Sequence, residues 1–298
     1  MSIRASALSF FLKRTLKKQM ASFEDPIAMR ARASSGFGRT PKEVQLEAID
    51  AGGVAAQWVR YPGAATDAAL LYLHGGGYVF GGLESHRDIA WRLSRAAGLN
   101  ALVVDYRLAP EHPFPGAVED ATASFLWLLA QGFSPDRILV AGDSAGGGLA
   151  VALMLRLKEL NHPLPKAAVL MSPWVDMAMT GASMTANADA DVMLSPGAMS
   201  RFATHYLGST DPRTALASPL YGDLSGLPPV QVLVGSTEVL LSDSEALVQH
   251  ITAAGGQAQL HVWPNMPHVF PIFASILPEA RAAIEEMARF MRTQLPSG

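Results

Sequence analysis

The stretch GDSAG at residues 142–146 places Ser144 between two glycines, in the pattern G-x-S-x-G. Residues 137–141 before it predict a buried strand, and residues 148–155 after it predict a helix. A serine on a sharp turn between a strand and a helix is typical of a nucleophile elbow, which projects the hydroxyl into a cleft. We therefore predict that Ser144 is a nucleophile. The alternative, a plain glycine-rich turn, does not account for both flanking elements.

The pattern after residue 40 alternates strands and helices, which predicts an α/β fold with a mostly parallel sheet flanked by helices. Strands are predicted at residues 44–49, 55–61, 69–74, 101–106, 137–141, 167–171, 230–235 and 258–263. Helices are predicted at residues 85–97, 117–131, 148–160, 242–254 and 278–295. No linker or internal repeat divides the 298 residues, so we predict a single domain spanning 1–298.

Two segments, about 1–40 and about 176–210, stand outside this alternation. The second segment is rich in methionine, with Met177, Met179, Met184, Met193 and Met199. Methionine adapts its shape to varied apolar ligands, although core packing is the simpler explanation for any one of these residues. Together the two segments are predicted to form a helical cap over an apolar site.

Composition narrows the classes of partner and cofactor. The chain has 49% hydrophobic residues, 16% charged residues and a net charge of −3, so nothing in it predicts a nucleic-acid partner. It has no cysteine, which excludes disulfides, thiolate catalysis and zinc–thiolate sites and fits a cytoplasmic protein. No stretch reaches the roughly 18 apolar residues of a spanning helix, so no stable membrane insertion is expected.

The first 18 residues are basic and contain no acidic residue; the cations are Arg4, Lys13, Arg14, Lys17 and Lys18. A largely apolar stripe lies along one face of the helix predicted there, formed by Leu8, Phe11, Leu12, Thr15 and Leu16. We predict that this stripe docks on the protein's own substrate site. A helix lying on a membrane surface is the alternative.

A serine hydroxyl needs a base to take its proton, and in the α/β-hydrolase arrangement the chain order is serine, acid, histidine. After residue 229 the histidines are His250, His261 and His268. His250 falls in a predicted helix and His261 in a predicted strand, so both are predicted to be structural. His268 follows the last strand in a loop at the carboxyl edge of the sheet, where ligands bind in open α/β sheets. We predict that His268 is the base.

The acid that orients the base is predicted to be Glu238, which lies three residues past the strand at 230–235. Asp243 is the alternative. Ser242 and Glu245 fit the spacing of a capping box, which would place Asp243 in the first turn of a helix and give it a structural role.

The negative oxygen of a tetrahedral intermediate needs backbone N–H donors. Residues 74–77 read HGGG after a predicted strand, a motif that forms the oxyanion hole in lipases and esterases. The N–H of Ala145, directly after the nucleophile, is predicted to be another donor. His74 is predicted to hold this loop through a hydrogen bond. A phosphate site is a poor alternative, because the chain has no Walker lysine or dinucleotide spacing.

Three long motifs occur in order: HGGGYVFG at residues 74–81, YRLAPEHPFPGAVED at 106–120 and GDSAGGGLA at 142–150. On these motifs the chain resembles the bacterial hormone-sensitive lipase family of carboxylesterases, from about residue 40 to its end. The resemblance implies an α/β-hydrolase fold with a helical cap. It also implies short- to medium-chain acyl esters as substrates, and no cofactor or metal.

By the same resemblance, the nucleophile is Ser144, the base is His268, and the oxyanion donors are Gly76, Gly77 and Ala145. Many members carry Asp-Pro-Leu where this chain has Glu238, Val239 and Leu240.

The charged residues of the 106–120 motif, which are Arg107, Glu111, His112 and Asp120, precede the nucleophile and lie among prolines. We predict that they form a rigid structural loop with paired charges rather than part of the catalytic centre.

The sequence thus predicts a serine carboxylesterase that works through an acyl-enzyme and acts on a small ester. Amide or peptide cleavage by the same residues is one alternative. A ligand-binding receptor is another, but the plant gibberellin receptor of similar sequence has lost the histidine that is present here as His268. Epoxide hydrolases and dehalogenases of this fold carry aspartate at the elbow, which Ser144 argues against. The edge strand at 258–263 could pair across a two-fold axis, which leaves a homodimer open.

Overall fold

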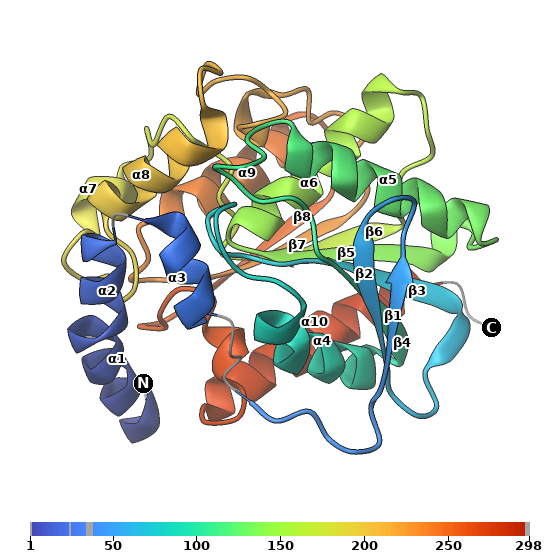
Figure 1. Ribbon diagram of the computed structural model, residues 1–298, viewed down its shortest axis with the longest axis horizontal. Helices are drawn as coiled ribbons and strands as arrows, with labels where there is room; N and C mark the ends of the chain where they lie inside the picture. The colour runs from blue at the N-terminus through green and yellow to red at the C-terminus, as the bar shows by residue number, and fades with distance from the viewer. Residues whose placement is uncertain (1, 24, 34–37, 296–298) are drawn as a thin grey trace.

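The computed structural model describes residues 2–23, 25–33 and 38–295. Its centre is an eight-stranded sheet in the order β1-β2-β4-β3-β5-β6-β7-β8 (Figure 1). Neighbours from β4 across to β8 pair in parallel, whereas β1 with β2 and β2 with β4 pair antiparallel. The strands are β1 (Gln45–Asp50), β2 (Ala55–Arg60), β3 (Ala65–Leu73), β4 (Leu99–Val104), β5 (Ile138–Asp143), β6 (Ala167–Met171), β7 (Val230–Gly235) and β8 (Ala258–Trp263).

Helices cover both faces of the sheet. In Figure 1, α4 and α10 lie together below it, and α5, α6 and α9 lie above it. The ranges are α4 (Leu83–Ala97), α5 (Gly116–Ala130), α6 (Ala145–Glu159), α9 (Leu241–Ala253) and α10 (Pro278–Gln294). Because helices cover both faces, every residue of β4, β5, β6 and β7 is buried, as their continuous apolar runs predict.

The N-terminal helices form a helical cap beside the carboxyl edge of the sheet. They are α1 (Ile3–Arg14), α2 (Leu16–Ser22) and α3 (Pro26–Ala33), and α2 packs against α8 (Pro196–Leu207) of the second segment, which also contains α7 (Ser183–Ala186). The rings of Phe23 and Phe202 stack with centroids 4.9 Å apart. Arg201 donates to the backbone carbonyls of Met20 and Ala21. The two segments that the sequence sets aside therefore lie side by side.

The predicted apolar stripe of the N-terminal helix is only partly correct. Leu12 is buried and Leu16 lines the cavity that Ser144 also lines, as docking requires. Phe11, however, is 60% exposed, because the buried residues of α1 are Ala5 and Leu12 and Phe11 lies outside the face that they share.

The predicted capping box at Ser242 and Glu245 is wrong. Helix α9 starts at Leu241, with Leu240 at the N-cap position and no side-chain cap. The Ser242 hydroxyl instead accepts from the backbone N–H of Ser183 in the second segment. The placement of Asp243 in the first turn of the helix is nevertheless confirmed.

Candidate active site

Ser144 lies on the turn between β5 and α6 with strained backbone angles, φ 54° and ψ −120°. Its N–H donates to Met171 O and its carbonyl accepts from the N–H of Trp174, so the end of β6 and the loop that follows it hold the turn. A Cβ on Gly146 would lie 2.1 Å from Leu73 O, so no larger residue fits at that position. This local geometry is that of the nucleophile elbow predicted from the sequence.

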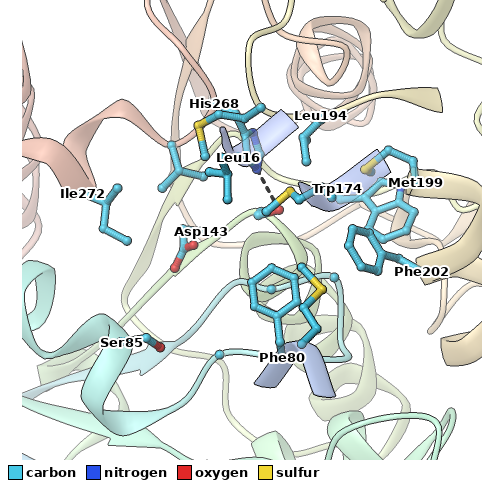
Figure 2. Close-up of a pocket in the computed structure, with 18 of the residues that line it drawn as sticks. Leu16, Phe80, Ser85, Asp143, Trp174, Leu194, Met199, Phe202, His268 and Ile272 are labelled. Atoms are coloured by element: carbon cyan, nitrogen blue, oxygen red, sulfur yellow. Dashed lines mark hydrogen bonds between the residues drawn. The ribbon is translucent and has the colours of Figure 1, made fainter. Parts of the chain in front are cut away.

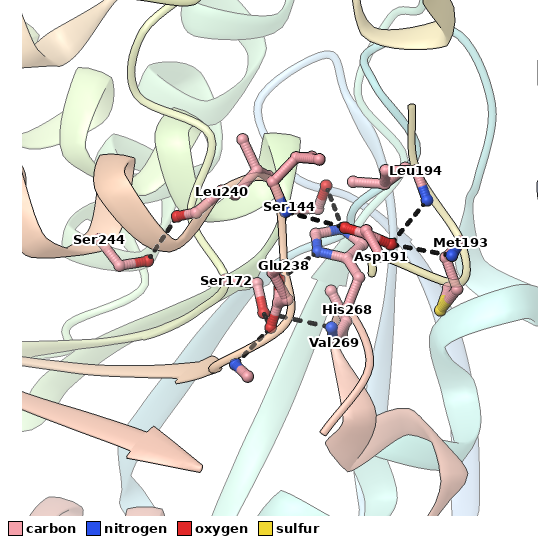
Figure 3. A network of polar contacts seen from close by, with 12 residues as sticks. Ser144, Ser172, Asp191, Met193, Leu194, Glu238, Leu240, Ser244, His268 and Val269 are labelled. Atoms are coloured by element: carbon pink, nitrogen blue, oxygen red, sulfur yellow. Dashed lines mark hydrogen bonds and ion pairs between the residues drawn. The ribbon is translucent and has the colours of Figure 1, made fainter. Parts of the chain in front are cut away.

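A chain of hydrogen bonds joins the three predicted residues from three separate loops (Figure 3). His268 Nε2 lies 2.9 Å from Ser144 Oγ. His268 Nδ1 lies 2.7 Å from Glu238 Oε2. Glu238 follows β7 and His268 follows β8, so parallel strands bring both to the elbow at the same edge of the sheet.

The electrostatic environment of His268 favours its charged form. Burial alone would lower its pKa, but the hydrogen bond and charge of Glu238 outweigh burial, and Asp191 and Asp143 add to the effect. The net result is a pKa above the ordinary value of 6.5. A raised pKa makes the imidazole a stronger base toward the serine proton.

Ser172 supports the acid, and the sequence analysis missed it. Its hydroxyl donates to Glu238 Oε1 at 2.8 Å, and it accepts from the N–H of Val269 at 3.2 Å. Glu238 Oε1 also accepts from the backbone N–H of Gly235. One carboxylate oxygen is therefore held fixed while the other faces His268. The signal that could have identified Ser172 is its position directly after the buried strand β6.

The glycine loop after β3 presents free backbone donors. Gly76 and Gly77 line the same cavity as Ser144. Across residues 2–23, 25–33 and 38–295, no hydrogen bond engages the N–H of Gly76, Gly77 or Ala145. A Cβ on Gly76, where φ is 117°, would lie 2.1 Å from Phe80 O. The loop therefore requires glycine and leaves its N–H groups available to an oxyanion.

Asp143, the second residue of the elbow motif, ties the elbow to this glycine loop. Its Oδ1 accepts from Tyr72 Oη at 2.7 Å and from the N–H of Gly75 at 3.0 Å, and His86 Nε2 lies 3.4 Å from its Oδ2. Burial would raise the pKa of Asp143, but the neighbouring His86 and the hydrogen bonds hold it below its ordinary value. No role for Asp143 was predicted from the sequence, because its partners lie in β3, in the loop after β3 and in α4, all far from it along the chain.

His74 has the structural role predicted for it. Its Nδ1 lies 2.8 Å from Gly75 O, and its ring stacks on Tyr106 with centroids 4.2 Å apart. Burial lowers its pKa to about 3, so the ring is neutral at physiological pH.

The hydrogen-bonded residues open into an apolar cavity of about 280 Å³ (Figure 2). Its walls come from the cap, the glycine loop, the second segment and the loop of His268, and include Leu16, Met20, Met29, Phe80, Trp174, Met193, Leu194, Met199, Phe202 and Ile272. Of the five methionines in the second segment, Met193 and Met199 line this cavity, whereas Met177 and Met184 are buried and Met179 is partly buried outside it. The expected methionine-rich wall is thus built in part by Met20 and Met29 of the cap.

The other sequence candidates have no part in the hydrogen-bonded chain of Ser144, His268 and Glu238. His261 Nδ1 pairs with Glu286, and His250 lies in α9. Asp243 accepts from the N–H groups of Val175 and Asp176, both at 3.0 Å. Burial raises the pKa of Asp243 to about 8.

In the loop at 106–120, Arg107 pairs with Asp120 and Glu119. Glu111 pairs with Arg30 of the cap. The predicted charge pairing of this loop is confirmed.

Among the described residues, no group of three or more His, Asp and Glu side chains is arranged to hold a metal ion. In the same part of the chain, no helix combines the length and the apolarity needed to cross a membrane.

Comparison with known proteins agrees with the fold and with an esterase-type hydrolase. A model of the alpha/beta hydrolase fold family matches residues 70–272. An acetyl-hydrolase of Streptomyces hygroscopicus is 46% identical over 270 residues, which cover 90% of this chain and 89% of that protein. An esterase of Acinetobacter venetianus is 36% identical over 83% of this chain and 82% of that protein.

Among solved structures, an esterase from the bacterial hormone-sensitive lipase family superposes with a TM-score of 0.94 at 43% identity, covering 99% of both chains. The esterase EstE5, in a crystal soaked with p-nitrophenyl butyrate, superposes with a TM-score of 0.95 at 39% identity, also covering 99% of both chains.

The fold and the relatives define a carboxylesterase- or lipase-like hydrolase of the α/β-hydrolase class. Within that class, the chain belongs to the bacterial hormone-sensitive lipase family of esterases.

Proposed function

We propose that this protein hydrolyses short- to medium-chain acyl esters through an acyl-enzyme on Ser144. The observation that carries the proposal is the hydrogen-bonded chain from Ser144 through His268 to Glu238, at the edge of an apolar cavity that free backbone N–H groups also line. The relatives named esterase and acetyl-hydrolase support the reaction class.

In the first half of the reaction, His268 Nε2 takes the proton of Ser144 as Oγ attacks the ester carbonyl. Glu238 stabilises the imidazolium and holds its Nδ1 proton. The carbonyl oxygen becomes negative and is held by the N–H groups of Gly76, Gly77 and Ala145. His268 then gives its proton to the leaving alcohol, and the acyl group stays on Ser144.

In the second half, water takes the place of the alcohol. His268 removes a proton from the water, whose oxygen attacks the acyl carbonyl. Collapse of the second tetrahedral intermediate breaks the bond to Oγ, which recovers its proton from His268. The acid is released and no cofactor is consumed.

The pH dependence of the reaction tests the role of His268. The neutral imidazole is the active form, so kcat/KM is expected to rise with pH as His268 loses its proton. Because Glu238 raises the pKa of His268, the midpoint of this rise is expected above the ordinary histidine value of 6.5. Initial rates on p-nitrophenyl butyrate across pH 5–9, corrected for spontaneous hydrolysis, would measure it. A flat profile would contradict the assignment of His268.

The size of the cavity predicts the acyl range. A volume of about 280 Å³ is just below the usual range for drug-sized ligands. We expect kcat/KM to be highest for acyl chains of about four to eight carbons, and about tenfold lower or more for chains of fourteen or more carbons. A series of p-nitrophenyl esters, kept below their critical micelle concentrations, would measure this range. A maximum at the longest chains would show that the cavity does not limit the acyl group.

Matched anilides in the same assay would separate ester from amide hydrolysis, because the reacting residues are the same in both reactions. A single domain with a two-segment cap, a cytoplasmic location and a homodimer through β8 remain predictions from the sequence.

A further inference from the structure

The second segment is hydrogen-bonded to the loop that carries Glu238. Ser183 Oγ donates to Val239 O at 2.6 Å, and Asn187 Nδ2 donates to Glu238 O at 2.8 Å. Asp191 Oδ2 accepts from the N–H of Val239 at 2.9 Å. Asn187 Nδ2 also donates to Ser236 O at 3.3 Å, so the backbone before and after the acid is held by a segment that the sequence suggests only as a wall of the substrate site.

Among these residues, Asp191 binds two different parts of the site through its carboxylate (Figure 3). One oxygen faces the wall of the cavity and the other faces the loop of Glu238. Its Oδ1 accepts from the N–H groups of Met193 and Leu194, at 2.8 and 2.9 Å. Met193 and Leu194 line the substrate cavity, whereas Val239 directly follows the acid. Asp191 is 1% exposed, so water does not compete for these three bonds.

The N-terminal cap meets the same turn. Lys17 Nζ donates to the carbonyls of Ala188 and Asp191, at 2.7 and 2.6 Å. The neighbouring residue Leu16 lines the cavity. Three parts of the substrate site therefore converge on the turn of Asp191: the cap, the Met193–Leu194 wall and the loop of the acid.

We propose that Asp191 is a positioning residue, which ties the wall of the acyl pocket to the loop of Glu238 and so holds the acid in line with His268. The inference rests on the proposed function, because it concerns the same triad. Asp191 touches neither the ester nor the reacting atoms and acts through Glu238.

The pKa of His268 provides an independent readout of this role. His268 is faced by the carboxylates of Glu238, Asp191 and Asp143 and by the hydroxyl of Ser144, and the cation at the turn of Asp191 is Lys17. Burial lowers the pKa of His268, and the three carboxylates raise it. Removal of the Asp191 charge therefore lowers that pKa and extends the active neutral form to lower pH.

The variant Asp191→Asn separates the contacts to the cavity wall from the contact to the loop of Glu238. Its amide oxygen can still accept from the N–H groups of Met193 and Leu194, but its NH₂ group then faces the N–H of Val239. We expect kcat on p-nitrophenyl butyrate to fall about tenfold to hundredfold, as for a small misplacement of a catalytic group. KM is expected to stay within about threefold, because the pocket wall keeps its bonds.

The acid limb is the part of the pH profile in which kcat/KM rises as His268 loses its proton. Its midpoint is expected to move to lower pH in Asp191→Asn. This midpoint does not depend on the fraction of folded protein, so partial unfolding does not obscure it. In Asp191→Glu, which keeps the charge but displaces both oxygens, kcat is expected to fall while the acid limb stays near its wild-type position. Asp189→Asn is the matched control, since it removes an exposed charge two residues away, and it is expected to behave as wild type.

The inference fails if Asp191→Asn retains the wild-type kcat and acid limb, if Asp191→Glu moves the limb as far as Asp191→Asn does, or if Asp189→Asn reproduces either effect. Failure of the proposed function is distinguishable, because wild-type turnover would then survive the loss of Ser144. A wild-type enzyme that depends on Ser144, with an unaltered Asp191→Asn, would overturn the role of Asp191 alone.

Discussion

Replacement of Ser144 by alanine is expected to lower kcat for p-nitrophenyl butyrate by about a millionfold, the loss typical of removing a serine nucleophile. In the proposed mechanism Ser144 Oγ becomes acylated, and no other hydroxyl lies within hydrogen-bond distance of His268 Nε2 among the described residues. A residual rate of about a thousandfold above water is expected, because the oxyanion donors and the cavity remain. Steady-state hydrolysis at saturating ester would measure the loss.

The matched control for this variant is Ser209→Ala, an exposed serine after α8. It is expected to keep wild-type kcat and KM. Thermal melts of both variants would show that the fold survives. Wild-type turnover by folded Ser144→Ala protein would overturn the proposed mechanism.

The variant Glu238→Gln is expected to lower kcat by about ten-thousandfold, as for the loss of the acid in other serine triads. Gly235 N–H and Ser172 Oγ hold one carboxylate oxygen, so the glutamine oxygen is expected to take that position. Its NH₂ group then faces His268 Nδ1, which must become an acceptor. The ring proton moves to Nε2, the atom that has to accept the serine proton. Steady-state rates across pH 5–9 would measure the drop, together with a shift of the acid limb to lower pH.

The parallel variant Asp243→Asn tests the alternative acid. Burial raises the pKa of Asp243 to about 8, so its carboxyl is largely neutral at pH 7 and asparagine is a close replacement. A single amide oxygen can accept from both Val175 and Asp176 N–H. We expect kcat within about threefold of wild type. Loss of turnover in Asp243→Asn, with Glu238→Gln still active, would assign the acid to Asp243.

The sequence predicts the parts of this molecule that depend on neighbours in the chain. The strands β6, β7 and β8 have the predicted bounds, because short apolar runs ended by glycine, proline or polar residues are local signals. Ser144 and His268 are likewise found from a motif and from a position after a strand. Parallel strands place such positions at one edge, so three distant loops could be expected to meet.

The roles of Asp191 and Asp143 could not be predicted, because each depends on partners brought close only by the fold. Ser172 could be placed at the carboxyl edge of the sheet from its position after β6, but its contact with Glu238 could not be predicted. The error at Ser242 has the same cause. Its spacing to Glu245 fits a local cap, but a tertiary partner, Ser183, takes the hydroxyl. The exposed Phe11 shows that an apolar stripe in the sequence can be wider than the face that the helix buries, which in α1 is formed by Ala5 and Leu12.

The cavity beside Ser144 is lined by two groups of residues, which come from different parts of the fold. The elbow and the glycine loop come from the sheet, whereas most apolar wall residues come from the cap and the second segment. Under the proposed function, mutations at positions such as Met20, Met29 or Met199 are expected to alter which acyl groups enter without displacing Ser144. Residues that would select the substrate are therefore different from residues that would carry out the reaction. Changes in the cavity wall can give a new substrate range while Ser144, His268 and Glu238 stay unchanged.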